Sequence, residues 1–230
     1  MFLNQLTNGL NNILNVMIPP VCYTCNSRIT IQKDCVCNNC FINIERNIDK
    51  LNGSSELGVR YFSKVESLYD YGQIVRELIH VYKYSSIKEI GRYLGRKAEE
   101  VLRREYPDFL NCDAIMSVPM HRSRYEERAF DHANYLLKII NKTLQITDYS
   151  KYIEKSVNTP KQAFLDIDKR LQNPKNSFRI KNSDVFKNKN ILLIDDIFTS
   201  GATVNSVCKL LKENGANYIN VFTIAAAGVK

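Results

Sequence analysis

The sequence predicts an α/β protein with a parallel, doubly wound sheet, preceded by a small cysteine-rich domain. Two strand–loop–helix units, over residues 114–143 and 191–213, predict the sheet, because parallel strands need crossover connections that are usually helical. Two CxxC pairs near the N-terminus predict the small domain. The chain has 230 residues, which is enough for one sizeable α/β domain and an appendage.

The first 18 residues predict a docking helix, because their leucines, isoleucines and Met17 fall on one helical face and Pro19-Pro20 ends the pattern. The segment has no basic region in front of its apolar residues, so it does not resemble a signal peptide. No stretch has the length and apolarity of a membrane span. We therefore expect a cytoplasmic protein.

Five of the seven cysteines lie between residues 22 and 40. Cys22 and Cys25 form one CxxC pair, and Cys37 and Cys40 form another. Two such turns can direct four thiolates at one ion, which predicts a closed, structural Zn²⁺ site with those four ligands. Cys35 leaves an alternative open, because a Cys-x-Cys pair with Cys37 could replace Cys40. A thioredoxin-like redox motif would need a single CxxC beside a βαβ pattern.

A short helix and a Gly/Ser-containing linker follow over residues 41–58, so we expect a cysteine domain over 1–50 and an α/β domain over 59–230. Residues 59–72 are rich in aromatic and β-branched side chains and predict a strand. Apolar spacing then predicts two helices, which are separated by a break near residues 84–86.

A second buried strand is predicted over residues 114–118, with a basic loop after it and then a helix over 131–143. His121, Arg122 and Arg124 lie in the loop, where open α/β sheets bind ligands. Guanidinium groups suit pyrophosphate oxygens, although a solvated basic turn would have the same composition. The long polar connection over residues 158–178 is typical of a functional lid.

The stretch ILLIDDIFTSGAT, residues 191–203, carries the most specific chemistry. A buried strand over 191–194 runs into Asp195 and Asp196, and a Thr-Ser-Gly turn then begins a helix that ends near Gly215. A helix N-terminus suits a phosphate, whereas the two acids would repel one but suit sugar hydroxyls. A ribose 5-phosphate satisfies both halves. A last strand is expected over 218–227.

Other sites also place acids after a buried strand, among them the Walker B strand and phospho-acceptor pockets. No GxxxxGK[ST] is present, so a nucleotide hydrolase would lack its phosphate loop. No GxGxxG follows a strand either, and a Ser/Thr/Gly turn could simply cap a helix.

IDDIFTSGAT resembles the phosphoribosyl-diphosphate (PRPP) motif of type I phosphoribosyltransferases. The resemblance implies a type I phosphoribosyltransferase-like fold, in which Asp195 and Asp196 are the catalytic acids that hold the ribose hydroxyls. It also implies that PRPP binds with Mg²⁺ and that His121, Arg122 and Arg124 form the pyrophosphate loop. The 5-phosphate would be held by the loop Thr199, Ser200, Gly201, Ala202 and Thr203.

Three features together resemble the ComF family of bacterial natural competence: the CxxC pairs, the VPMHRSR segment and the Asp-Asp loop. LIHVYKY and RLQNPKNSF resemble further family segments. ERAFDHA departs from the family's RGFNQA, with Ala129 in place of glycine and Asp131-His132 in place of Asn-Gln. The resemblance implies a role with imported single-stranded DNA and with other competence proteins, such as a DNA-uptake helicase.

Lys and Arg total 32 against 24 Asp and Glu, a basic balance that favours polyanionic ligands. Two hypotheses follow. The chain either transfers ribose 5-phosphate from PRPP to an acceptor, or it binds PRPP without turnover and serves DNA uptake. A small-molecule phosphoribosyltransferase acting on a nucleobase or amine, unrelated to DNA, is the alternative to both competence roles.

Overall fold

The computed structural model describes residues 21–29, 35–44, 59–85, 87–128, 130–156 and 177–227. The helix expected over residues 1–18 and most of the lid expected over 158–178 lie outside these ranges.

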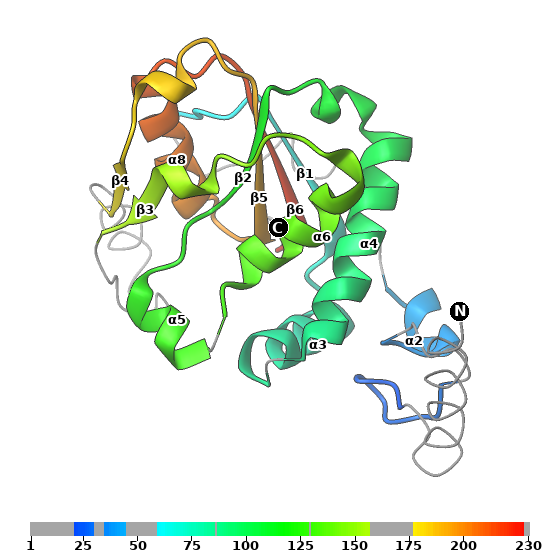
Figure 1. The fold of residues 1–230 in the computed structure, drawn as a ribbon. Helices are drawn as coiled ribbons and strands as arrows, with labels where there is room; N and C mark the ends of the chain where they lie inside the picture. The colour runs from blue at the N-terminus through cyan, green and yellow to red at the C-terminus, as the bar shows by residue number, and fades with distance from the viewer. Residues whose placement is uncertain are drawn as a thin grey trace, which may run out of the picture.

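A four-stranded parallel sheet forms the centre of the α/β domain (Figure 1). The strands lie in the order β1-β6-β5-β2, with bounds Lys64–Asp70 for β1, Ile219–Ala226 for β6, Ile191–Phe198 for β5 and Ala114–Ser117 for β2. The prediction of a parallel α/β sheet is confirmed.

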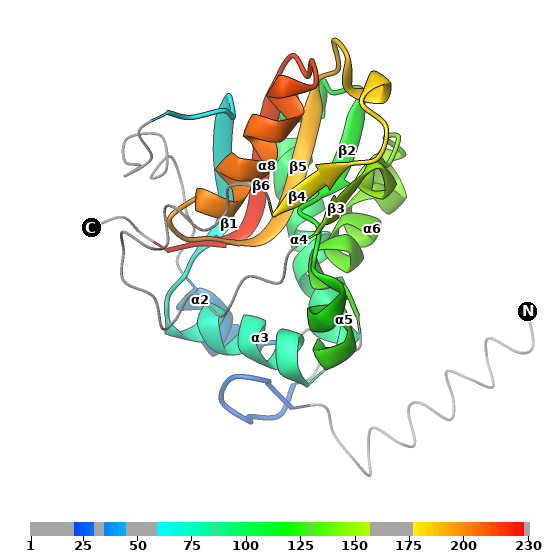
Figure 2. The same ribbon diagram turned by 90° about the vertical axis from the view of Figure 1, so that its left-hand side faces the viewer.

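Helices cover both faces of the sheet, as Figure 2 shows. One face carries α3 (Gln73–Tyr84), α4 (Lys88–Glu105) and α6 (His132–Leu144), and the other carries α8 (Ala202–Glu213). Along β5 the side chains alternate: Leu192 and Ile194 join the first layer, and Ile191 and Leu193 join the second. A parallel strand buried on both faces reads as a continuous apolar run, which is what the sequence has there.

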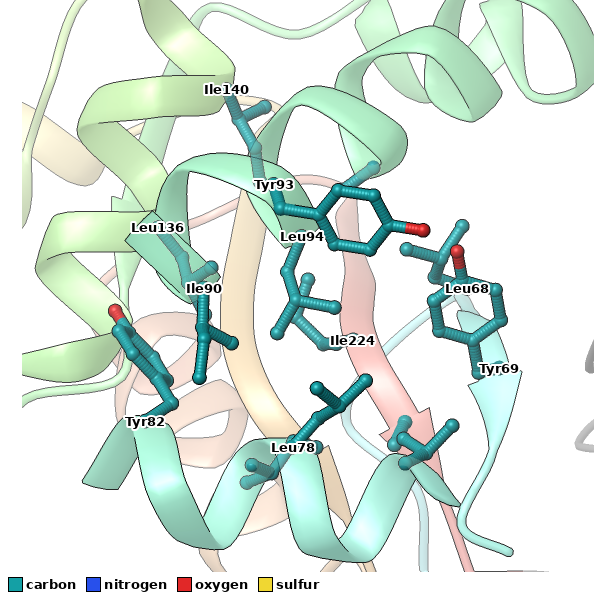
Figure 3. Close-up of a cluster of buried hydrophobic side chains, with 14 of the residues drawn as sticks. Leu68, Tyr69, Leu78, Tyr82, Ile90, Tyr93, Leu94, Leu136, Ile140 and Ile224 are labelled. Atoms are coloured by element: carbon teal, nitrogen blue, oxygen red, sulfur yellow. The ribbon is translucent and has the colours of Figure 1, made fainter. Parts of the chain in front are cut away.

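The larger core lies between the sheet and α3, α4 and α6 (Figure 3). Leu78 and Tyr82 from α3, Leu94 from α4 and Leu136 from α6 meet strand side chains such as Ile224, and all five are almost fully buried. The Tyr82 hydroxyl donates a hydrogen bond of 2.8 Å to the carbonyl oxygen of His132, so this buried polar group is satisfied.

Two glycines allow α4 to approach its neighbours closely. A Cβ atom at Gly91 would lie 2.6 Å from Cε2 of Tyr82, and one at Gly95 would lie 2.7 Å from Cγ2 of Ile139. Neither distance is compatible with van der Waals contact. The separation of α4 and α6 therefore depends on the absence of a side chain at these positions.

Short elements complete the described chain. A two-stranded antiparallel hairpin pairs β3 with β4, and three 3-10 helices and the helix α5 lie in connections. Their bounds are Ile153–Lys155 for β3, Phe178–Ile180 for β4, Pro107–Leu110 for η1, Ser150–Tyr152 for η2, Asp184–Phe186 for η4 and Arg122–Arg128 for α5.

Two sequence predictions need correction. The basic segment after β2 is the helix α5 rather than a loop, because RSRYEER consists mostly of good helix formers. The strand expected over 191–194 continues to Phe198, because β6 pairs alongside it with Asp195 opposite Thr223 and Ile197 opposite Ala225. Both acids therefore belong to β5 itself.

The cysteine-rich segment packs beside α3 and α4 (Figures 1 and 2). Its buried Ile29, Val36 and Ile44 belong to the same core cluster as the inner faces of those helices. Its short helix α2, Asn38–Ile42, places the Phe41 ring 5.7 Å from Nζ of Lys97. The division into domains over 1–50 and 59–230 stays a prediction, because residues 45–58 lie outside the described ranges.

We predict that Gly95→Ala destabilises the protein, against the usual effect of this change in a helix. Alanine favours a helix interior over glycine by about 1 kcal/mol. The new methyl group would overlap the branched Cβ of Ile139, which cannot rotate away, and overpacking of this kind costs about 1–3 kcal/mol. Urea unfolding should therefore show a lower free energy of unfolding for the variant.

Gly72→Ala is the matched control. No atom lies within 4 Å of a Cβ built there, and the backbone is extended. Gly72 is the N-cap of α3, where alanine is less favourable, but alanine also reduces the entropy of the unfolded chain. These effects oppose each other, so the free energy of unfolding should change by less than about 1 kcal/mol. A Gly95→Ala protein as stable as the wild type would contradict the close-packing argument.

Candidate functional site

The connections that follow β2 and β5 run to opposite faces of the sheet and leave a crevice at its carboxyl edge. The chain leaves β2 through α5 and α6, which lies on one face, whereas it leaves β5 through α8, which lies on the other. Neighbouring strands whose crossovers go to opposite faces leave a gap at their carboxyl ends, and open α/β sheets bind ligands there.

A cavity of about 260 Å³ lies at this crevice. It is open to solvent and its lining is mainly polar, with residues from six elements or the loops beside them. They are Lys83, Val118, Pro119, Met120, His121, Arg124, Ala133, Lys155, Asp195, Asp196, Ile197, Thr199 and Thr203. The cavity thus brings together the acids and the basic segment that the sequence analysis singled out separately.

Asp195 and Asp196 line the cavity from the last half of β5. The backbone N–H of Asp196 donates a hydrogen bond of 2.8 Å to Oδ1 of Asp195, which fixes the orientation of that carboxyl. Oδ2 of Asp196 lies 2.8 Å from Nζ of Lys83, at the end of α3. Both partners of this ion pair are about 15% exposed, so it is less screened than a surface pair.

The two acids are not equivalent electrostatically. Burial raises the pKa of Asp195 to about 8, and the neighbouring charge of Asp196 adds to the increase. Asp196 has Lys83 as a counter-ion, and Lys83 only partly offsets the effect on Asp195. Without a ligand, the site therefore favours the protonated form of Asp195.

The turn after β5 leads directly into the N-terminus of α8. Gly201 has φ 72°, in the left-handed region that favours glycine, and it directly precedes α8. Thr199 and Thr203 line the cavity, and Oγ of Ser200 accepts a hydrogen bond of 3.4 Å from the N–H of Ala202. The cavity therefore meets the N-terminus of a twelve-residue helix, where N–H groups and the helix dipole favour an anion.

The basic segment reaches the cavity through His121 and Arg124. His121 caps α5, because its Nδ1 accepts a hydrogen bond of 3.2 Å from the N–H of Ser123. Arg124 lies one turn further along the helix. Arg122 begins α5, and its side chain lies outside the described part of the structure.

Sequence reasoning missed two lysines that the fold brings into the cavity. Lys83 lies at the end of α3, within the LIHVYKY segment, where no pattern indicated a ligand contact. Lys155 ends β3, and burial together with the charge of Arg124 lowers its pKa. The cavity lining thus contains Lys83, Arg124 and Lys155 together with the two carboxyl groups.

Asp131 and His132, where the chain departs from the family pattern, have structural positions. The Asp131 carboxylate caps α6 by accepting a hydrogen bond of 2.9 Å from the N–H of Asn134, and burial raises its pKa. The His132 ring is fully buried, with its centroid 4.2 Å from that of Phe130. From this stretch, Ala133 is the residue that lines the cavity.

A second cluster of possible ligands lies in the cysteine-rich segment. The sulfur atoms of Cys22, Cys25, Cys37 and Cys40 all lie within 4.8 Å of one another, and those of Cys25 and Cys37 are 3.6 Å apart. A tetrahedral Zn²⁺ site with bonds of about 2.3 Å separates its sulfurs by about 3.8 Å, so the four side chains fit the ion. Hydrogen bonding from Ser27 lowers the pKa of Cys25 to about 6, whereas burial raises the pKa of Cys40. The empty site therefore favours the thiolate at Cys25 and the thiol at Cys40.

Cys35 is buried in the same segment but is not among these four residues. Its carbonyl oxygen accepts a hydrogen bond of 3.0 Å from the N–H of Tyr23, so its backbone ties the two halves of the segment together. The geometry therefore favours Cys40 over Cys35 as the partner of Cys37.

Comparisons with known proteins identify the family. A family profile described as phosphoribosyl transferase domain matches residues 126–230. The DNA utilization protein YhgH of Escherichia coli O157:H7 is 30% identical over 165 residues, which cover 71% of this chain and 72% of that protein. Competence protein F of Haemophilus influenzae is 31% identical over 50% of this chain and 51% of its own length. The chain belongs to the ComF family.

Another relative of this ComF-family protein is the competence protein ComFC of Bacillus subtilis, which is 27% identical over 69% of this chain and 62% of that protein. The α/β domain has the type I phosphoribosyltransferase-like fold, a parallel sheet with flanking helices. Within the described ranges, the helices of this ComF-family chain are too short or too polar to cross a membrane.

We predict that Asp195→Asn changes how stability depends on pH. The pKa of Asp195 is about 8 in the folded protein and about 3.9 in the unfolded chain, so the folded state holds the extra proton between these values. Wild-type stability should therefore fall as pH rises from about 4 to about 8. An asparagine can still accept the hydrogen bond from Asp196, so the variant should gain relative stability over this range, by up to a few kcal/mol.

Thermal unfolding at several pH values measures this difference. Asp184→Asn is the control, because Asp184 is exposed and Lys187 lowers its pKa. Any effect of this substitution on the pH dependence of stability is therefore confined to acid pH. Parallel pH profiles for wild type and Asp195→Asn would show that Asp195 is charged in the empty site.

We also predict one zinc ion per chain, bound by Cys22, Cys25, Cys37 and Cys40. Metal analysis of protein purified without chelators should give about one equivalent. Cys37→Ser should lose the metal, because three thiolates leave the tetrahedron open, whereas Cys35→Ser should retain it. If Cys35→Ser lost the metal and Cys40→Ser retained it, Cys35 and not Cys40 would be the fourth zinc ligand.

Proposed function

We propose that the cavity at the carboxyl edge of the sheet binds PRPP together with Mg²⁺. The observation that carries the proposal is the position of the Asp195–Asp196 pair and the 199–203 turn in one cavity, opposite His121 and Arg124. This arrangement has separate places for a sugar, for one phosphate and for a more highly charged group. PRPP has all three.

Each part of the ligand has a matching group. The carboxylates of Asp195 and Asp196 would accept hydrogen bonds from the ribose 2′- and 3′-hydroxyls. The 5-phosphate would lie at the N-terminus of α8, near Thr199 and Thr203, and the pyrophosphate would face His121 and Arg124. Lys83 and Lys155 extend the cationic side, and we propose them as additional ligand contacts.

The donor set also fits Mg²⁺, which prefers oxygen ligands and commonly binds one or two carboxylates together with substrate phosphates. Asp195 and Asp196 are the candidate protein contacts. Bound with PRPP, the ion would neutralise charge on the pyrophosphate leaving group. The chain's own part is to orient the ribose and to hold the pyrophosphate, so that an acceptor can approach the anomeric carbon.

We further propose that the protein acts on single-stranded DNA during uptake, as a cytoplasmic competence factor alongside other competence proteins such as a DNA-uptake helicase. The names of its relatives, DNA utilization protein and competence protein, support this role. The excess of basic residues supports a polyanionic partner. A phosphoribosyltransferase acting on a small nucleobase or amine is the competing proposal.

Isothermal titration with PRPP and Mg²⁺ tests the ligand. The wild type should bind, and the double variant Asp195→Asn/Asp196→Asn should bind at least about tenfold more weakly. Each lost charge-assisted hydrogen bond is worth about 1.5–3 kcal/mol, and about 1.4 kcal/mol corresponds to a tenfold change. The control Asp184→Asn removes a distant exposed carboxylate and should leave the affinity unchanged.

An unchanged affinity in a folded double variant would contradict the assignment of the acids. Product analysis of the wild type with PRPP and a panel of bases, amines and oligonucleotides then separates the remaining possibilities. Transfer to a base or amine would favour the small-molecule enzyme, and binding without any product would favour a PRPP-binding uptake factor.

A further inference from the structure

A second, larger hollow lies between α4 and α6, away from the PRPP cavity. Its volume is about 530 Å³. Ala133, at the start of α6, lines the PRPP cavity, whereas Lys142 lies about 14 Å further along the helix axis. We call this hollow the α4–α6 groove; its lining residues are Arg92, Arg96, Glu99, Ile139, Lys142, Thr143 and Gln145.

The floor of the groove is fixed by close packing. Gly95 and Ile139 bring the two helices together at its base, with no room for an added methyl group. At one end, a guanidinium nitrogen of Arg103 donates a hydrogen bond of 3.1 Å to the carbonyl oxygen of Thr143, which links α4 to α6. The groove is therefore a rigid, preformed feature of the domain.

Its walls are cationic. Arg92, Arg96 and Lys142 contribute three positive charges, whereas the single acid of the lining, Glu99, forms an ion pair with Arg103. After its N-cap, α6 contains no acidic residue that could balance Lys142. Glu89 lies 3.0 Å from Arg92. Among the described residues named here, four are cations and two are carboxylates.

The cations are arranged along a line. Arg92, Arg96 and Arg103 recur on α4 at spacings of four and seven residues, so they share one stripe that extends about 16 Å along the helix. Nε of Arg92 donates a hydrogen bond of 3.3 Å to the hydroxyl of Tyr135, which orients its guanidinium group. A chain of regularly spaced phosphates matches such a line better than a single small anion does.

We propose that the α4–α6 groove is a binding site for the phosphate backbone of a nucleic acid strand. The inference rests on the proposed function, in which the protein handles single-stranded DNA, and it places that strand away from the PRPP cavity. The groove lining contains no aromatic ring, so recognition there is through phosphates and is independent of base sequence. Single-stranded DNA and PRPP then bind at opposite ends of α6 and do not compete.

The test uses fluorescence anisotropy of a fluorescein-labelled oligothymidylate with the full-length, metal-loaded protein across a salt series. Phosphate contacts to a single strand contribute about 0.7 each to the magnitude of the slope of log affinity against log salt. Arg96→Gln/Lys142→Gln removes two exposed groove cations and should reduce that magnitude by about 1.4, with weaker binding at low salt. Its affinity for PRPP should not change.

Lys209→Gln/Lys212→Gln is the matched control, because it removes the same net charge from α8, on the other face of the sheet. Its slope should stay close to that of the wild type, and saturating PRPP with Mg²⁺ should leave the wild-type DNA curve unchanged. Thermal unfolding of both variants checks the fold, since all four side chains point at least partly into solvent.

Three results would overturn the inference. Equal losses in the groove and control variants would mean that net charge, and not the groove, attracts the strand. Competition between PRPP and DNA would place the strand across the PRPP cavity. Absence of DNA binding by the wild type at low salt would remove both the DNA partner and the groove assignment, while the PRPP titration would still stand as a separate result.

Discussion

The pairing of β5 between β2 and β6 is the constraint on which the rest of the structure depends. The strand is buried on both faces over Ile191–Ile194, so neighbouring strands must satisfy its backbone. Pairing with β6 then continues past the apolar run and carries two carboxylates to the edge of the sheet.

The charges at this edge come from segments far apart in the sequence. Lys83 lies at the end of α3, between β1 and β2 in the chain, Arg124 follows β2, and Lys155 ends a hairpin strand. The fold therefore surrounds two acids with cations that arrive from separate directions. Such a site can hold a ligand that has both hydroxyl groups and phosphates, because its lining contains carboxyl groups for the hydroxyls and basic side chains for the phosphates.

Local patterns identified the acids, the glycine turn and the CxxC pairs, because in each case the chemistry lies within a few consecutive residues. Lys83 and Lys155 escaped notice, since their position depends on how α3 and the β3–β4 hairpin meet the sheet. The hairpin itself has three residues in each strand, too few for an alternating pattern, and its strands are separated by residues 156–177. The sequence predicts a loop where α5 lies, because a cluster of basic residues after a strand is typical of a ligand-binding loop. The helix forms because most of these residues also have high helix propensity.

The helix α4 has a sequence typical of a surface helix, with six basic and four acidic residues among eighteen. Its environment is different on each side. One face is buried in the core, and its glycines fix the distance to α6. Lys97 lies over the ring of Phe41 from the cysteine-rich segment. The arginine stripe faces the groove. Few positions on this helix are therefore free to vary. Among related chains, we expect α4 to tolerate substitution less than its polar composition would suggest, and to resist insertion of even one residue, which would rotate all of these faces by about 100°.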